Sequence, residues 1–344
     1  MAPIKSILLV GKFSTTAYTY ASSFERIFKS LGYDVTTFNI KQNFIFGLPQ
    51  NYRLFAPLNN YWCNRALIYA VKKHQPNCIF FLKADIITPA TLRIIKKISA
   101  AKLVHFYPDN PFSLWNGNAN ANVLRALPVF DHFLIWSKML VPALESAGCK
   151  KVSYLPFAYD ETIFEQELTI SNTERTRYAA DVSFIGTWEP ERAWWLSQLR
   201  ARMPHLNLAI WGNGWEHERK SNLANCIKGP ALYPPESLKA FRCSSINLNF
   251  IRRQNMTSHN MRTMELPASK SFMLTQHSQE QCHELFKENF SIACFESIDE
   301  LVEKITFYLH NAAEREQIIA HAFEQAQQYR LSTVLKNFLM KELS

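Results

Sequence analysis

The sequence predicts an α/β protein with two Rossmann-like domains, each built on a mostly parallel sheet. Short apolar runs of strand length alternate along the chain with longer segments of helical periodicity. This alternation stops at a polar stretch near residue 166 and begins again at residue 181. At 344 residues the chain is long enough for two hydrophobic cores, each from roughly 150–170 residues.

The first half opens in the order strand, helix, strand. Residues 6–11, SILLVG, form an apolar run typical of a strand buried on both faces. Apolar residues at helical spacing follow in 18–33, Gly32 supplies a stop signal, and a second strand begins at residue 34. Thr88 and Pro89 start another helix. Further strands are expected within 77–85, 102–111, 131–137 and 151–157, which gives a first domain of residues 1–165.

The second half repeats this pattern after a polar linker of residues 166–180. Ser297 and Glu300 have the spacing of a capping box at the start of a helix over 297–310, and a further helix is expected over 312–330. Residues 181–330 are therefore expected to form a second domain, and residues 331–344 a helix that packs back on the first. The strands expected in the second domain are 181–186, 207–212, 245–250, 271–275 and 291–295.

Composition excludes several classes of protein. The net charge is +9, but the basic residues are scattered and no run of five occurs, so nucleic acid is not expected as a partner. The seven cysteines form no CxxC pair; we expect small core residues and a reducing compartment. The amino-terminal apolar run is too short for a signal peptide or a membrane span. We expect a cytoplasmic protein; the aromatic content leaves peripheral contact with the inner face of a membrane open.

Ligands of such sheets bind outside the carboxyl ends of the strands, so the loops there are the candidate sites. Residues 11–18, GKFSTTAY, suit an anion or a sugar hydroxyl, or else an ordinary turn. In 105–113, HFYPDNPFS, Asp109 is a candidate general base and His105 a weaker one. The alternative there is a plain turn, because Pro-Asp-Asn-Pro has strong turn chemistry.

Two loops of the second half suit a nucleotide. In 186–192, GTWEPER, Gly186 and Thr187 precede a helix start where phosphate can approach, and Arg192 can reach the same phosphate. An ordinary first helical turn explains this loop equally well. In 211–216, WGNGWE, the glycines suggest close backbone approach, and Trp211 is a candidate wall of a base or sugar pocket.

The most distinctive stretch is HNMRTMELPASKS, residues 259–271. It is either a helix start with Thr263 as the N-cap or a nucleotide site. In the second case Arg262 meets the diphosphate and Glu265 meets a ribose diol.

Residues 181–330 resemble the CgeB-like glycosyltransferases, a branch of the group-1 glycosyltransferases with the GT-B fold of two facing Rossmann-like domains. The matching stretches include DVSFIGTWEPER, LAIWGNGW, INLNFIR, MRTMELPAS with FMLT, and IDELVEKITFYL, in the order of the family; YPDNPF and LPFAYDETIF match its first domain more loosely. The resemblance implies transfer of a sugar from a nucleotide-sugar donor, with a UDP-sugar favoured. The second domain would bind the donor, and the first domain a glycan, lipid-linked or protein acceptor.

The same resemblance assigns roles to residues. Glu265 would hydrogen-bond the ribose, Asn260, Arg262 and the Thr263 backbone would meet the diphosphate, and Tyr233 would lie near the base. The resemblance implies no metal and no cofactor besides the donor, since positive side chains neutralise the leaving diphosphate. The absence of any Asp-x-Asp agrees with this, and Cys282-His283 has no partner at metal-ligand spacing.

Two positions depart from the family. Thr257 stands where many retaining members carry a glutamate, and Lys270 stands where a glycine is usual, so that Lys270 either adds a phosphate contact or alters the site. Retention or inversion at the sugar stays open, with Asp109 as the expected base of an inverting mechanism. A catalytically inactive binding or scaffold protein and a nucleotide-sugar epimerase are the alternatives to a transferase.

Overall fold

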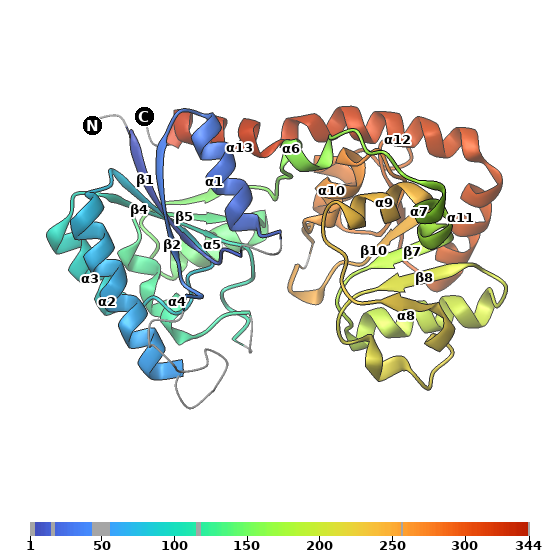
Figure 1. Ribbon diagram of the computed structural model, residues 1–344, viewed down its shortest axis with the longest axis horizontal. Coiled ribbons are helices and arrows are strands. Elements are labelled where there is room, and N and C mark those ends of the chain that lie inside the picture. Colours follow the sequence, from blue (N-terminus) through green and yellow to red (C-terminus); the bar gives the residue numbers. More distant parts are fainter. Residues whose placement is uncertain (1–3, 15–17, 43–55, 115–117, 256, 343–344) are drawn as a thin grey trace. The chain divides into compact units, whose positions relative to one another are not determined.

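The computed structural model describes residues 4–14, 18–42, 56–114, 118–255 and 257–342 (Figure 1). The chain divides into two compact units. Unit 1 comprises Met1–Phe157 together with Leu331–Ser344, and unit 2 comprises Ala158–Arg330. Each unit contains a six-stranded sheet in which the named strands pair in parallel, so the predicted α/β class with two parallel sheets is confirmed.

The sheet of unit 1 has the strand order β2-β1-β3-β4-β5-β6. The order reverses between β1 and β3, and this reversal is where ligands bind in doubly wound sheets. β3 is buried along its whole length, as expected for a central strand. The strands are β1 (Ser6–Gly11), β2 (Asp34–Asn39), β3 (Cys78–Leu82), β4 (Lys102–Tyr107), β5 (His132–Ile135) and β6 (Val152–Tyr154).

Helix starts in unit 1 follow their capping residues. The Thr19 hydroxyl accepts from the backbone of α1, and Thr88 does the same for α3, which has Pro89 in its first turn. The last helix, α13, packs against α1 (Figure 1). Its Phe338 ring lies 5.3 Å from the His132 ring of β5. The helices are α1 (Tyr20–Ser30), α2 (Ala56–His74), α3 (Pro89–Ile98), α4 (Ala121–Ala126), α5 (Val141–Ser146) and α13 (Leu331–Glu342).

The sheet of unit 2 has the order β12-β11-β10-β7-β8-β9, the Rossmann arrangement, and reverses between β7 and β10. Residues 166–180, expected as a linker, include helix α7, whose Ser171 and Glu174 form a capping box. Lys239 of α9 pairs with Glu174 at 2.5 Å and ties α7 to the unit. The strands are β7 (Ala180–Ile185), β8 (Leu208–Trp211), β9 (Ile227–Gly229), β10 (Ser244–Asn249), β11 (Met273–Gln276) and β12 (Ala293–Phe295).

The helices of unit 2 include a short π-helix, η6, between β11 and β12. They are α6 (Glu161–Phe164), α7 (Asn172–Tyr178), α8 (Pro190–Arg202), α9 (Glu236–Cys243), α10 (Arg262–Ala268), η6 (Glu280–Leu285), α11 (Ile298–His310) and α12 (Ala312–Ala326). The α11 start has the predicted cap, since Ser297 accepts from the Glu300 backbone at 3.1 Å. None of the helices in the described ranges combines the length and apolar character that a membrane span requires.

Five of the seven cysteines are free, Cys149 and Cys243 among them half-buried, and two form a disulfide. Cys63, Cys78 and Cys226 are buried and free, as small core residues are expected to be. Cys282 of η6 and Cys294 of β12 instead form a disulfide. Their separation of 12 residues carries no motif in the sequence, and the pair forms because η6 lies against the neighbouring strand.

Candidate active site

The loops after the neighbouring strands β7 and β8 lie backbone to backbone, beside the reversal of strand order between β7 and β10. The Gly186 N–H donates to Trp211 O at 2.9 Å, and the Trp188 N–H donates to Asn213 O at 2.8 Å. A Cβ on Gly212 would lie 1.9 Å from Gly186 O, so only glycine fits at that position. The glycines predicted from close approach therefore hold two strand ends together, and Gly186 and Thr187 lie in the loop that leads to α8, which begins at Pro190.

Asn260 is the side chain that caps α10. Its Oδ1 accepts from the Thr263 N–H at 3.2 Å, and its Nδ2 donates to Asn249 Oδ1, at the end of β10, at 2.9 Å. The helix-start interpretation assigned the cap to Thr263, which is incorrect. Thr263 is fully buried inside the first turn, and its hydroxyl donates to Gln281 Oε1 at 3.0 Å. α10 begins at Arg262, so Thr263 already lies within its first turn, and the Asn260 side chain supplies the acceptor for the Thr263 N–H.

Arg262 and Glu265 form an ion pair along one turn of α10. Arg262 Nη1 lies 2.5 Å from Glu265 Oε2, and Nη2 donates to Ile185 O, at the end of β7, at 3.4 Å. The guanidinium also lies 4.7 Å from the centre of the Phe241 ring. Burial raises the pKa of Glu265, and Arg262 opposes that rise. A buried carboxylate is thus held beside a cation at the carboxyl edge of the sheet.

Three guanidinium groups lie close enough to repel one another; we call Arg192, Arg252 and Arg262 the arginine cluster. Burial lowers the pKa of Arg192 to about 10, and Arg252 and Arg262 lower it further. Glu189, 3.7 Å away, opposes the shift. Arg192 Nη1 also donates to Thr187 O at 2.8 Å, which places it against the loop after β7. The cluster is suited to an anion with several oxygens, such as a diphosphate.

A cavity of about 540 Å³ adjoins the loops after β8 and β9. Its walls include Gly212–Glu216 and Gly229–Pro230. Trp215 lies at this wall, but its side chain is 1% exposed and packs against Phe184. Trp211, the predicted wall, packs elsewhere: it is 3% exposed, and its ring lies 6.0 Å from that of Tyr178. Trp215 Nε1 donates to Gly186 O at 2.9 Å, which links this wall to the loop before α8. Tyr233, expected near the base, is 49% exposed in the segment between β9 and α9.

Lys270 follows the carboxyl end of α10, at the opposite end of the helix from Arg262. Its φ of 53° is in the left-handed region, where glycine is favoured after a helix. Its ammonium lies 4.9 Å from the centre of the Phe323 ring of α12. Helix termination thus explains why a glycine suits this position, and the phosphate contact, one of the two alternatives for Lys270, stays a prediction. The other departure, Thr257, accepts at its carbonyl from the Glu280 N–H at 2.9 Å.

Charged groups also gather at the strand ends of unit 1. Asp109, after β4, is ion-paired with Lys83, after β3. Lys83 has a φ of 46°, an uncommon value for a non-glycine residue. Partial burial lowers the pKa of Lys12, after β1, and Asp85 and Asp109 oppose the change. Of the loop 11–18, residues 15–17 lie outside the described residues, so its proposed role in binding an anion rests on sequence alone.

His105 does not accompany Asp109. It lies inside β4, is 1% exposed, and its ring is 4.6 Å from the Phe130 ring and 5.1 Å from the Phe133 ring. Neither ring nitrogen has a hydrogen-bond partner within the described ranges. Burial lowers the pKa of His105 to about 3, so the ring is neutral. Every residue from Leu103 to Tyr107 of β4 is buried, so both faces of the strand are covered and His105 lies in the core.

Comparison with known proteins agrees with this architecture. Residues 191–339 match the family model described as "Glycosyl transferase-like". No curated protein matches the chain significantly. A solved glycosyltransferase from Rickettsia africae is similar with a TM-score of 0.69 and 11% identity, covering 98% of this chain and 99% of the other. Sucrose-phosphate synthase from Thermosynechococcus elongatus is similar with a TM-score of 0.70 and 10% identity, covering 98% of this chain and 99% of the other. HepE of Anabaena in complex with UDP-glucose is similar with a TM-score of 0.66 and 12% identity, covering 98% of this chain and 99% of the other.

At these identities the solved structures establish the fold, which is the two-domain GT-B fold of the group-1 glycosyltransferases. The family match adds the enzyme class and covers α8 through most of α13. The resemblance to the CgeB-like region is thereby confirmed. The protein is a glycosyltransferase of the GT-B fold whose residues 191–339 match the glycosyl transferase-like family model.

Proposed function

We propose that unit 2 binds a UDP-sugar and that the protein transfers its sugar to a glycan, lipid-linked or protein acceptor bound by unit 1. The observation that carries this proposal is the ion pair of Arg262 with Glu265 inside the arginine cluster. A diphosphate requires cations, and a ribose diol requires a hydrogen-bond acceptor. Arg262 and Glu265 supply one of each, one helical turn apart on α10. UDP is favoured because HepE, of the same fold, was solved with UDP and with UDP-glucose.

The diphosphate is assigned to Arg192 and Arg262, next to the backbone of Gly186 and Thr187 before α8. The lowered pKa of Arg192 means that its charge is poorly solvated and repelled by its neighbours. An anion would relieve both effects, because bidentate guanidinium–phosphate bonds replace the missing water. The same arginines neutralise the leaving UDP, so the transfer chemistry we propose uses no metal ion.

The ribose is assigned to Glu265, whose carboxylate accepts hydrogen bonds from the diol. Asn260 and Thr263 act behind it, since their bonds to Asn249 and Gln281 position α10. The base is assigned to the cavity beside Trp215. Its volume of about 540 Å³ lies within the usual range for small-ligand sites, and Asn213 and Glu216 supply polar groups in its wall.

Asp109 is assigned as the group that receives the proton of the acceptor hydroxyl. Its ion pair with Lys83 orients the carboxylate at the carboxyl edge of the unit 1 sheet, where ligands of this fold bind. His105 has no part in this assignment, because its ring is buried among aromatic side chains.

Calorimetric titration with UDP and with GDP, in the presence of a chelator, tests the donor site. We expect micromolar binding of UDP, binding of GDP at least tenfold weaker, and a 10- to 100-fold loss for UDP in Glu265→Ala. That loss corresponds to about 1.5–3 kcal/mol for a hydrogen bond to a charged group. Glu303→Ala, an exposed carboxylate on α11, is the matched control and should bind like the wild type.

Failure to bind either nucleotide, or equal binding by Glu265→Ala and the wild type, contradicts the proposal. Slow release of UDP from a UDP-sugar without acceptor separates an active transferase from an inactive binding protein of the same fold. Asp109→Asn should reduce transfer by at least 100-fold while UDP affinity stays unchanged, because a general base acts on the reaction and not on donor binding.

A further inference from the structure

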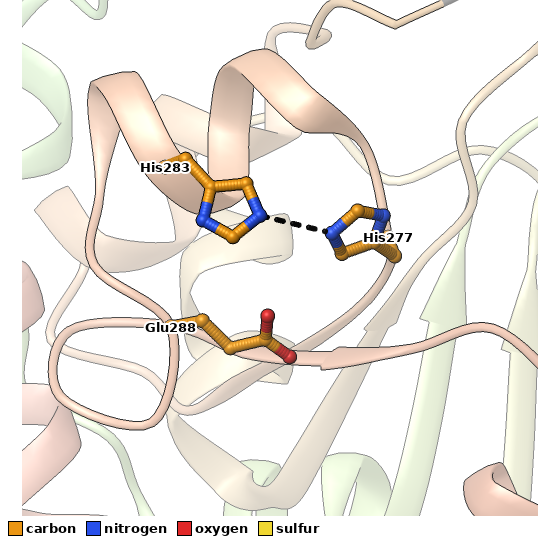
Figure 2. Close-up of side chains that lie close together, drawn as sticks. All are labelled: His277, His283 and Glu288. Carbon is orange, nitrogen blue, oxygen red and sulfur yellow. Dashed lines mark hydrogen bonds between the residues drawn. The ribbon is translucent and has the colours of Figure 1, made fainter.

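Two histidines and a glutamate converge between β11 and β12, outside the groups assigned to the donor. His277 directly follows β11, His283 belongs to η6, and Glu288 lies in the turn after η6. Their ligand atoms all lie within 4.8 Å of one another, and the two imidazole rings and the carboxylate face a common point (Figure 2). The Nε2 atoms of His277 and His283 are 3.5 Å apart.

The spacing of these nitrogens suits coordination to one ion. Two imidazoles bound to a tetrahedral zinc ion at the usual Zn–N length have their nitrogens about 3.3–3.4 Å apart. The observed 3.5 Å is close to this separation. Two imidazoles and one carboxylate form a ligand set that zinc accepts, with positions left for water. Without an ion, the same nitrogens share a single proton as a histidine–histidine hydrogen bond (Figure 2).

An outer carboxylate orients one of the two histidines. His277 Nδ1 lies 3.1 Å from Glu296 Oε1. A proton on Nδ1 donated to Glu296 leaves the Nε2 lone pair directed at His283. Metal-binding histidines commonly have this arrangement, which selects the tautomer and makes the ligand more basic.

The neighbouring cation does not block the carboxylate. Lys304 Nζ is 3.8 Å from Glu288 Oε1, but it is 2.8 Å from Glu300 Oε1 and also donates to Cys294 O. Lys304 therefore keeps its main partners if Glu288 turns to an ion. His277 and Glu288 are half-buried and His283 is exposed, so an ion can enter from solvent.

We propose that His277, His283 and Glu288 bind one transition-metal ion of the zinc class. The backbone holds the ligands near each other, because the Glu288 N–H donates to Cys282 O at 3.1 Å and Cys282 is linked to Cys294. The ion joins η6 to the end of β11 and stabilises this part of unit 2. It takes no part in the transfer chemistry proposed above, which uses the arginine cluster.

The test uses the full chain, stripped of metal and kept free of reductant so that the Cys282–Cys294 disulfide stays intact. Zinc is titrated in competition with a chromophoric chelator, and thermal unfolding is followed with and without zinc. We expect one equivalent with micromolar or tighter affinity and a rise in unfolding temperature. His283→Ala should bind at least tenfold more weakly, His277→Ala likewise, and Glu296→Gln about tenfold more weakly. His205→Ala, an exposed histidine of the same unit, is the control and should bind like the wild type.

Two results would overturn the proposal. If the wild type binds zinc no more tightly than the double variant His277→Ala/His283→Ala, the two histidines form only a hydrogen-bonded pair. Binding that survives in His283→Ala but disappears in Cys282→Ser would assign the metal to the cysteines. Cobalt substitution checks this independently, because thiolate ligands produce a strong charge-transfer band and a histidine–carboxylate set does not.

Discussion

Arg262 and Glu265 are bonded to each other at 2.5 Å, with the carboxylate 6% exposed and the guanidinium also in reach of Ile185 O at 3.4 Å. The pair thus connects the first turn of α10 to the end of β7, across the point where the sheet reverses its order. The cation and the carboxylate satisfy each other before any ligand binds. A donor bound here has to share this pair, so the same two residues link the stability of the fold to recognition.

Glu265→Gln is expected to weaken UDP binding about tenfold and to leave the protein equally stable or slightly more stable at pH 8. Burial raises the pKa of Glu265 in the folded state, so this group favours folding below its unfolded pKa and loses that contribution as pH rises through the folded pKa. A neutral amide avoids this penalty. Denaturant unfolding and UDP titration measure both effects, with Glu303→Gln as control. A loss of stability above about 1 kcal/mol would show that the ion pair is needed for the fold.

Gly212→Ala is expected to destabilise unit 2 by about 2–3 kcal/mol. The new Cβ would lie 1.9 Å from Gly186 O and 2.8 Å from Trp215 Nε1, and the backbone carbonyl has no room to retreat. Gly229→Ala is the matched control, because its Cβ would meet Trp211 Cδ1 at an ordinary 3.7 Å. Chemical denaturation of both variants tests the contact. Equal stability of the two would contradict the close approach of the loops.

His105→Leu is expected to make unit 1 less sensitive to acid. Burial lowers the pKa of His105 to about 3, so the unfolded chain binds a proton there that the folded chain does not. The wild type therefore loses stability as pH falls below the unfolded pKa near 6.5, by about 2 kcal/mol at pH 5. The drop in unfolding free energy between pH 8 and pH 5 should therefore be about 2 kcal/mol smaller in His105→Leu than in the wild type. His74→Leu, at the exposed end of α2, should keep the wild-type dependence.

Lys270→Gly is expected to be more stable than Lys270→Ala by about 1 kcal/mol, because a side chain in the left-handed region is strained and glycine is not. Both variants remove the contact with Phe323, so their comparison isolates the backbone effect. UDP affinity should be unchanged in both, since Lys270 lies at the far end of α10 from Arg262. A common loss of affinity would restore the phosphate contact first expected from the sequence.

Secondary structure was predicted well where hydrophobic periodicity is strong and less well where it is weak. The strand expected over 6–11 is β1, Ser6–Gly11, and the strand expected over 245–250 is β10, Ser244–Asn249. The edge strand β9, Ile227–Gly229, was missed because three residues at the margin of a sheet show no alternation. α7 was read as linker because its sequence is polar on most positions and only its last residue, Tyr178, is buried.

By itself, the sequence determined two doubly wound parallel sheets and the loops at their strand ends. The reason is physical: strands buried on both faces need continuous apolar runs, and parallel crossovers need helices between them. Only the tertiary structure decided where individual side chains point. It turned His105 and Trp215 into the cores of their units, and it brought His283 to His277, because those directions depend on contacts between segments that no local pattern records.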